Sequence, residues 1–240
     1  MNWPGGTREI RGSASELKFL VDPDTGQRVR EAVRSWLAPD PYASGPTLDE
    51  YFTTTLYFDT PEFDTYQRRR SYRRAKYRIR RYGQGSIVFL ERKLRTADVL
   101  TKRRMTVHID ELDRLSSDSL DASADWAGGW FHERLMMRRL AAVCQVSYRR
   151  TARIGMTDNG PVRLTVDDDL RGTRIDTAAF VPGDAARPIT DRTIVELKFM
   201  GPIPAVFRRV VETFALEQER VSKYRLGIEA TRMEDVTIHA

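Results

Sequence analysis

Charged and apolar side chains alternate along several short stretches of this chain. Residues 76–82 have the sequence Lys-Tyr-Arg-Ile-Arg-Arg-Tyr. Successive side chains of a β-strand point to opposite faces of the sheet, so Arg78 and Arg80 share one face. Tyr77 and Ile79 then occupy the other face. This pattern predicts a strand with one basic face and one apolar face.

A second pattern, a glutamate and a lysine two residues apart, recurs within apolar segments. It occurs at Glu16-Leu17-Lys18, Glu91-Arg92-Lys93 and Glu196-Leu197-Lys198. Because side chains alternate, both charges of each copy lie on the same side of the strand. Lys102 and Arg163 stand in comparable strand patterns, so basic residues are expected on one face of many strands.

Period-two alternation and β-branched or aromatic content predict eight strands, and apolar residues at helical spacing predict three helices. The fold class expected from these elements is α+β, dominated by antiparallel strands. The strands are expected over residues 16–21, 51–59, 76–82, 86–93, 102–109, 146–152, 162–168 and 194–199, and the helices over residues 25–37, 130–143 and 204–216.

Length and composition are those of a globular protein, with 240 residues, of which 40% are hydrophobic and 31% charged. No low-complexity tract or long linker divides the chain, so we expect a single domain over residues 1–240, with a core of about residues 16–227. No apolar run approaches the roughly 20 residues of a membrane span. Residues 1–6 lack the features of a secretory signal and Cys144 is the only cysteine, which favours a cytoplasmic protein.

The charge balance indicates an anionic partner. The formal net charge is +6 and the sequence pI is about 9.6, which is compatible with nucleic acid, an anionic membrane or a phosphate-rich small molecule. The densest basic run lies within residues 68–74, where it would form either a solvated patch or a tunnel mouth that gathers anionic substrate. No nucleic-acid-binding motif accompanies it, so the sequence does not favour nucleic acid as the partner.

The basic rows have two interpretations. Solvated faces of amphipathic strands are the ordinary one, but like charges opposite one another on a sheet are destabilising. A closed or nearly closed sheet offers the other interpretation: basic rows point into a wet lumen and apolar rows pack outward against helices. Arginine and lysine suit phosphate, and Glu196 and Glu91 could help hold a hard cation such as magnesium or manganese.

The order of several motifs resembles the VTC domain, the polyphosphate polymerase domain of the vacuolar transporter chaperone complex. That domain belongs to the triphosphate tunnel metalloenzyme, or CYTH-like, superfamily. The resemblance runs from about Glu16 to Gly227. It is carried by Glu16-Leu17-Lys18-Phe19, Leu56-Tyr57-Phe58-Asp59-Thr60, Tyr77-Arg78-Ile79-Arg80-Arg81-Tyr82-Gly83, Phe89-Leu90-Glu91-Arg92-Lys93, Tyr148-Arg149-Arg150-Thr151-Ala152, Val162-Arg163-Leu164-Thr165-Val166-Asp167, Val195-Glu196-Leu197-Lys198 and Ser222-Lys223-Tyr224.

The resemblance implies a closed antiparallel β-barrel tunnel of about eight strands with helices packed outside. It also implies transfer of the γ-phosphate of ATP to a growing polyphosphate chain, with Mn²⁺ or Mg²⁺ as cofactor. Lys18, Arg78, Arg80 and Glu196 would be catalytic, and Glu196 would ligate the metal, with Glu91 as a further candidate ligand. The remaining phosphate-binding residues would be Lys93, Lys102, Arg150, Arg163, Lys198 and Lys223.

Two alternatives use the same basic tunnel. An inorganic triphosphatase or polyphosphatase would let water replace the phosphate acceptor, with tripolyphosphate or polyphosphate as substrate. A non-catalytic protein would merely bind polyanions.

The first strand also departs from the wider superfamily, because Ser13-Ala14-Ser15-Glu16-Leu17-Lys18 has one glutamate where the superfamily has two.

Overall fold

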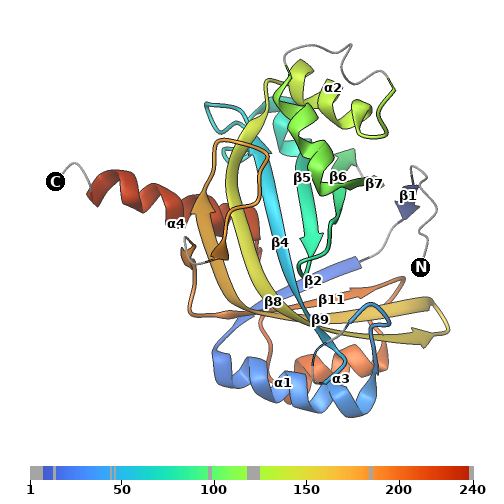
Figure 1. The fold of residues 1–240 in the computed structure, drawn as a ribbon. Helices are drawn as coiled ribbons and strands as arrows, with labels where there is room; N and C mark the ends of the chain where they lie inside the picture. The colour runs from blue at the N-terminus through green and yellow to red at the C-terminus, as the bar shows by residue number, and fades with distance from the viewer. Residues whose placement is uncertain are drawn as a thin grey trace.

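The computed structural model describes residues 8–12, 15–43, 45, 47–96, 99–117, 125–183 and 186–237. Within these residues the strands form one antiparallel, 11-stranded sheet (Figure 1). The strands are β1 (Arg8–Gly12), β2 (Ser15–Val21), β3 (Ala38–Pro39), β4 (Glu50–Asp59), β5 (Ala75–Tyr82), β6 (Ile87–Thr96), β7 (Val99–His108), β8 (Ala141–Thr157), β9 (Gly160–Arg174), β10 (Arg187–Pro188) and β11 (Thr193–Phe199).

The sheet is curled but open, and the prediction of a closed barrel is therefore wrong. The strand order is β1-β7-β6-β5-β4-β8-β9-β11-β2, with β10 beside β9 and β3 beside β8. A closed barrel needs every strand to be hydrogen-bonded on both sides. In the described part of the chain, β1 pairs only with β7. Strand β2 pairs with β11, and its other side makes an isolated bridge between Phe19 and Gln218. These two strands are the edges of the sheet, and no ladder joins them.

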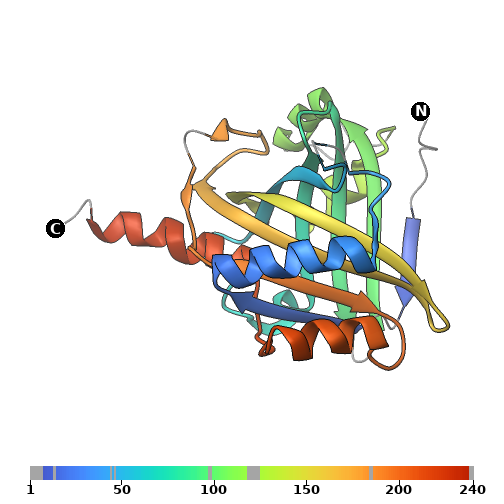
Figure 2. The ribbon, with the colours of Figure 1, turned by 90° about the horizontal axis from the view of Figure 1, so that it is seen from below.

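Two helices cover the outer, convex face of one half of the sheet, and one covers the other half (Figures 1 and 2). Beneath β2, β9 and β11, Val29 and Val33 of one helix and Phe207 and Val210 of another join a shared apolar core. Above β5 to β7, Phe131 lies in a second core. These helices are α1 (Pro23–Trp36), α3 (Ala205–Thr213) and α2 (Gly129–Met137), and two 3-10 helices, η1 (Arg70–Arg74) and η2 (Ile109–Ser116), complete this side.

A fourth helix, α4 (Lys223–Thr237), packs on the inner, concave face and was not predicted from the sequence. Its Tyr224 and Ile228 share a buried apolar cluster with Tyr57 of β4 and Val146 of β8. Gly227 allows this close approach, because a Cβ atom there would stand 2.7 Å from the Val146 Cγ2 atom. The helix thus fills the apolar part of the concave face and leaves its charged part uncovered.

Local boundaries differ from the sequence prediction most clearly around residues 138–143. The predicted helix over residues 130–143 ends at Met137, and β8 begins at Ala141. Arg139 has a φ of 51°, which breaks the helix between the two elements. None of the helices in the part of the chain that the structure describes combines the length and apolar character that a membrane crossing requires.

Candidate functional site

The basic rows predicted from the sequence lie on the concave face of the sheet. Strand register shows this directly: Arg78 is opposite Glu91, which in turn is opposite Arg104. On the other half, Thr165 is opposite Glu196, which is opposite Lys18. Ten predicted site residues share this face, namely Lys18, Arg78, Arg80, Glu91, Lys93, Lys102, Arg150, Arg163, Glu196 and Lys198, and Lys223 joins them from the start of α4.

Glu91 is the buried centre of one charge cluster. It accepts a hydrogen bond of 2.7 Å from Arg78 Nε and another of 2.6 Å from Arg104 Nε, and Lys102 Nζ lies 2.7 Å from its Oε1 atom. Burial raises the pKa of this carboxyl group, but the surrounding cations outweigh burial and hold the pKa well below its ordinary value. Glu91 is therefore an ionised counterion to three cations.

A second cluster forms where two of the Glu-x-Lys motifs pair in opposite directions. Glu16 lies opposite Lys198, and Lys18 lies opposite Glu196. Lys18 Nζ is 2.8 Å from Glu16 Oε1 and 3.4 Å from Glu196 Oε2, while Lys198 Nζ is 2.7 Å from Glu196 Oε1. Two carboxylates thus share one lysine. Glu16 was not among the predicted site residues, although its repeat with Lys18 was the signal that could have included it.

The electrostatics of this second cluster favour its ionised form. Burial raises the pKa of Glu16, but the neighbouring lysines lower it to about 2. Burial also raises the pKa of Glu196, and Lys198 and Lys18 bring it well below its ordinary value. Lys18 responds in the opposite sense: burial lowers its pKa, but the two glutamates raise it above the ordinary value of a lysine.

A third cluster attaches α4 to the sheet. Asp167 is fully buried and accepts hydrogen bonds of 2.6 and 2.7 Å from Nε and Nη2 of Arg150. Lys223 Nζ lies 2.6 Å from the Asp167 Oδ2 atom. Burial raises the pKa of Asp167, but both cations lower it overall. The start of α4, with Ser222 and Lys223, is therefore fixed against the charged part of the concave face.

Tyrosines stand among the cations of the concave face, and sequence reasoning did not select them. Arg163 Nη2 donates a hydrogen bond of 2.6 Å to the Tyr51 hydroxyl group and also pairs with Asp40 at 2.7 Å. Arg104 Nη2 donates to the Tyr82 hydroxyl group at 3.3 Å. Burial raises the pKa of Tyr82, but the adjacent arginines lower it to about 7.

Positive charge exceeds negative charge on this face. Burial lowers the pKa of Lys76 and of Lys102 to about 8, and neighbouring cations contribute to both shifts. Crowding of this kind is relieved when an anion enters. The cations are Lys18, Lys76, Arg78, Arg80, Lys93, Lys102, Arg104, Arg150, Arg163, Lys198 and Lys223, and the carboxylates that contact them are Glu16, Asp40, Glu91, Asp167 and Glu196.

Buried polar atoms on the concave face lack a protein partner within the described residues. They are the Tyr148 hydroxyl group, the Oγ1 atoms of Thr53 and Thr165, and Nε of Arg163. Thr53 lies opposite Tyr148, and Thr165 lies opposite Glu196. Buried polar groups normally have a hydrogen-bond partner. A ligand with many acceptor oxygens, or the water around it, would supply one.

The donor set also fits a hard divalent cation. In the described part of the chain no three histidine, cysteine, aspartate or glutamate residues gather as a ready-made metal cluster. Magnesium-type ions need only one or two protein carboxylates when phosphate oxygens and water complete the shell. Glu196 and Glu16, which share Lys18, offer two such carboxylates. Glu91 remains a predicted ligand, although its oxygens already contact three cations.

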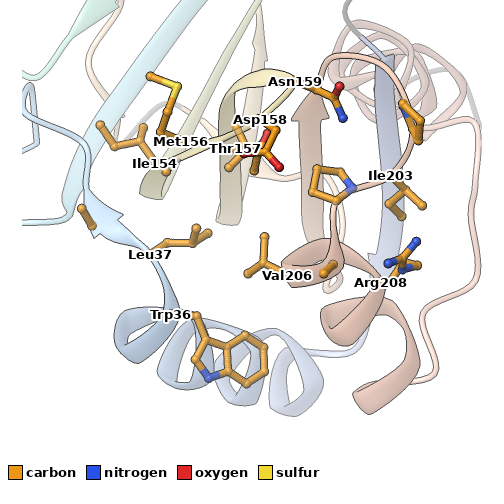
Figure 3. A pocket seen from close by; sticks show the side chains of 16 residues that line it. Trp36, Leu37, Ile154, Met156, Thr157, Asp158, Asn159, Ile203, Val206 and Arg208 are labelled. Atoms are coloured by element: carbon orange, nitrogen blue, oxygen red, sulfur yellow. The ribbon is translucent and has the colours of Figure 1, made fainter.

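A cavity of different chemistry lies away from these clusters. It has a volume of about 650 Å³ and is found between the end of α1, the β8–β9 hairpin and the start of α3 (Figure 3). Its lining includes Trp36, Leu37 and Val206, and Arg208 supplies a basic group. None of the predicted site residues lines it, so it is separate from the basic face.

The curled antiparallel sheet with a basic concave face is a tunnel-like fold. The protein belongs to the VTC domain family, whose match covers residues 13–232. A search of curated protein sequences found no match. Family membership supports a function related to triphosphate or polyphosphate and an enzyme that acts on phosphates.

Some solved structures are similar to this chain at low sequence identity. A candidate adenylate cyclase from Bacillus halodurans has a TM-score of 0.50 and 17% identity, covering 88% of this chain and 95% of its own. The PH1819 protein from Pyrococcus horikoshii has a TM-score of 0.49 and 15% identity, covering 90% and 99%. A candidate adenylyl cyclase from Hippeastrum with a dominant triphosphatase activity has a TM-score of 0.45 and 14% identity, covering 90% and 95%.

Proposed function

We propose that this protein is a metal-dependent polyphosphate polymerase, which transfers the γ-phosphoryl group of ATP to the end of a polyphosphate chain on the concave face. The observation that carries the proposal is the excess of buried and half-buried cations there, in a protein of the VTC domain family. A linear chain of phosphates has one negative charge at every unit, so it matches rows of cations better than a compact anion does.

Phosphoryl transfer gives the protein little covalent chemistry to perform. The bond between the γ-phosphorus and its bridging oxygen breaks, and a terminal oxygen of the polyphosphate chain forms the new bond, leaving ADP. Catalysis then consists of holding the two phosphate groups in line and neutralising their charge. Lys18, Arg78 and Arg80 would neutralise the transferred group, because all three side chains lie on the concave face.

The other cations would position the chain on either side of the transferred group. Lys93 and Lys102 lie on one half of the sheet, and Arg163 and Lys198 lie on the other. Lys223 would act from α4, beside Arg150 of β8. In this arrangement the donor and the acceptor approach along the curled face from its two sides.

A bound Mg²⁺ or Mn²⁺ ion would polarise the phosphate oxygens and offset their charge. Glu196 would be its main protein ligand, and Glu16 is the best-placed second carboxylate. Each glutamate would exchange its contact with Lys18 for the metal, which would free the Lys18 ammonium group for phosphate. The excess of positive charge on the face would then be balanced by the substrate rather than by the protein.

The proposal can be tested by incubating the purified protein with ATP and Mn²⁺ and separating orthophosphate from long-chain product. We expect long chains from the natural protein and a loss of about 100-fold or more in Glu196→Gln, since one group that acts on transition-state charge has an effect of this size. Glu133→Gln, at an exposed position of α2, is the matched control and should retain activity.

Two results of this assay would contradict polymerase function. Release of orthophosphate from ATP or tripolyphosphate without chain growth would assign a hydrolase to the same face. The other result is absence of turnover while both the natural protein and Glu196→Gln still bind tripolyphosphate in metal-free buffer. The protein would then be a non-catalytic binding protein.

A further inference from the structure

Five exposed arginines lie close together in the segment that leads into β5. They are Arg68, Arg69, Arg70, Arg73 and Arg74, and η1 contains the last three. Arg69 pairs with Asp64 at 3.5 Å. Within the described residues no ion pair joins any of the other four to a carboxylate. This arginine segment is therefore a strongly positive surface in which only Arg69 has a carboxylate partner among the described residues.

The loop that precedes η1 is fixed at the edge of the concave face, beside α4. Asp59, at the end of β4, accepts hydrogen bonds of 2.8 and 2.9 Å from the backbone N–H groups of Thr65 and Tyr66. Arg225 of α4 donates to the Tyr66 carbonyl oxygen at 2.6 Å. The loop that carries the arginines is thereby attached both to the sheet and to α4.

From this loop the basic surface continues onto the concave face. The chain passes from Arg74 through Ala75 to Lys76, whose Nζ atom donates a hydrogen bond of 3.2 Å to Ser222 Oγ. Arg68 contributes to the lowered pKa of Lys76, after burial and the larger effects of Lys18, Lys93 and Arg78. A phosphate chain that leaves the concave face at Lys76 would meet the arginine segment next.

Two arginines of the segment have a left-handed backbone. Arg68 has a φ of 57° and Arg70 a φ of 38°, both in the left-handed region. Glycine or asparagine adopts this region at lower cost than arginine. Strained backbone of this kind is concentrated at functional sites.

We propose that the arginine segment binds the part of a polyphosphate chain that extends beyond the concave face, and so guides the product as it leaves. This inference rests on the proposed function only for the identity of the bound chain as polyphosphate. Nucleic acid fits less well, because its bases need free aromatic faces. The aromatic rings of this region are already covered: Arg138 stacks on Tyr72 at 4.3 Å and Arg225 on Tyr66 at 4.4 Å.

The test compares two triple variants that lose the same charge. The first carries Arg68→Gln, Arg73→Gln and Arg74→Gln in the arginine segment. The control carries Arg95→Gln, Arg114→Gln and Arg208→Gln, at exposed positions of β6, η2 and α3. Binding of tripolyphosphate, long-chain polyphosphate and a single-stranded oligonucleotide is titrated at two salt concentrations, and circular dichroism checks that each variant is folded.

We expect the segment variant to bind long-chain polyphosphate about tenfold more weakly than the control, because three exposed charge contacts of modest strength are lost. Its affinity for tripolyphosphate should stay within about twofold of the control, since the short chain is held by the concave face. Its affinity for the long chain should change less with salt concentration than that of the control.

Three results would overturn the proposal. The first is equal affinity of the two variants for long-chain polyphosphate. The second is a loss of affinity in the segment variant that is the same for tripolyphosphate and the long chain. The third is a greater loss of affinity for the oligonucleotide than for polyphosphate. These outcomes are distinct from failure of the proposed function. That failure would appear in the natural protein, either as no binding of tripolyphosphate or as binding without chain synthesis.

Discussion

Lys93 Nζ on β6 lies 3.2 Å from Glu16 Oε2 on β2, although these strands are near opposite ends of the strand order. The curl of the sheet brings the two side chains together across the concave face. A side-chain ion pair therefore connects the two halves where the backbone makes no ladder. Polyphosphate would be held between these halves.

Coupling between these two residues can be measured with a double-mutant cycle of Lys93→Met and Glu16→Gln. The side chains are 40% and 22% exposed, so we expect a coupling free energy of about 0.2–1 kcal/mol that falls with added salt. Urea unfolding of the four proteins gives this value. A cycle of Lys93→Met with Glu133→Gln is the control and should show no coupling. Zero coupling between Lys93 and Glu16 at low salt would mean that the halves do not meet in solution.

Removal of the charge of Glu91 should have a much larger effect on stability. Glu91 is 1% exposed, and Glu91→Gln leaves Arg78, Lys102 and Arg104 without their shared counterion. We expect a loss of about 3–5 kcal/mol in the free energy of unfolding, as when one partner of a buried ion pair is removed.

Tripolyphosphate should restore part of this loss, because it supplies negative charge to the same cations. Asp169→Asn is the control, since Asp169 and Arg171 form an exposed pair, and it should cost less than about 1 kcal/mol. A change below 1 kcal/mol in Glu91→Gln would show that Glu91 is not the buried counterion described above.

Tripolyphosphate affinity should fall as pH rises through about 8. Burial lowers the pKa of Lys76 and Lys102 to about 8 in the free protein. Only the charged form attracts phosphate, so binding near pH 8 should draw protons from solution. Calorimetry in buffers of different ionisation enthalpy measures this uptake.

The variants Lys76→Met and Lys102→Met should reduce the proton uptake, and the exposed Arg208→Gln should not.

The stability of the ligand-free protein should change with pH in the opposite direction to the affinity. A lysine whose pKa is lower in the folded state than in the unfolded state destabilises the folded state while it is charged. Its unfavourable contribution is relieved as pH rises from about 8 to the unfolded value near 10.4. Proton release on binding, or affinity that is constant from pH 7 to 9, would contradict the lowered pKa values.

The position of α4 can be tested at Gly227. In Gly227→Ala the new Cβ atom would stand 2.7 Å from Val146 Cγ2, so we expect a loss of about 1–3 kcal/mol from overpacking, despite the higher helix propensity of alanine. Thermal or urea unfolding measures the change. At Gly183 a Cβ atom meets nothing within 4 Å, and Gly183→Ala should be nearly neutral. Stabilisation by Gly227→Ala would place α4 away from the sheet.

Which side chains share a face could be predicted from the sequence, because strand alternation is a local property. Arg78 and Arg80 lie on the concave face, and Tyr77 and Ile79 on the convex one, as their spacing requires. Openness of the sheet could not be predicted, since it depends on which strands at the edges find partners. Such pairing is set by contacts distant in sequence.

Two helix errors have local causes. The predicted helix over residues 130–143 was too long because Leu140 and Val143 continue its apolar spacing, yet the chain turns at Arg139 and enters β8. Helix α4 was not predicted because its buried side chains do not form a regular apolar stripe in the sequence. They match the shape of the concave face that the helix covers. For the candidate site, Lys223 was predicted only through the family resemblance, and Glu16 and Tyr82 became candidates only from the structure.

The most direct test of a phosphate site on the concave face is a crystal structure of the protein with tripolyphosphate and Mn²⁺. We expect the phosphates between Lys18 and Arg78, with the metal at Glu196. Phosphate density in the cavity near Trp36, or only on the outer surface, with the concave clusters unchanged, would contradict the assignment.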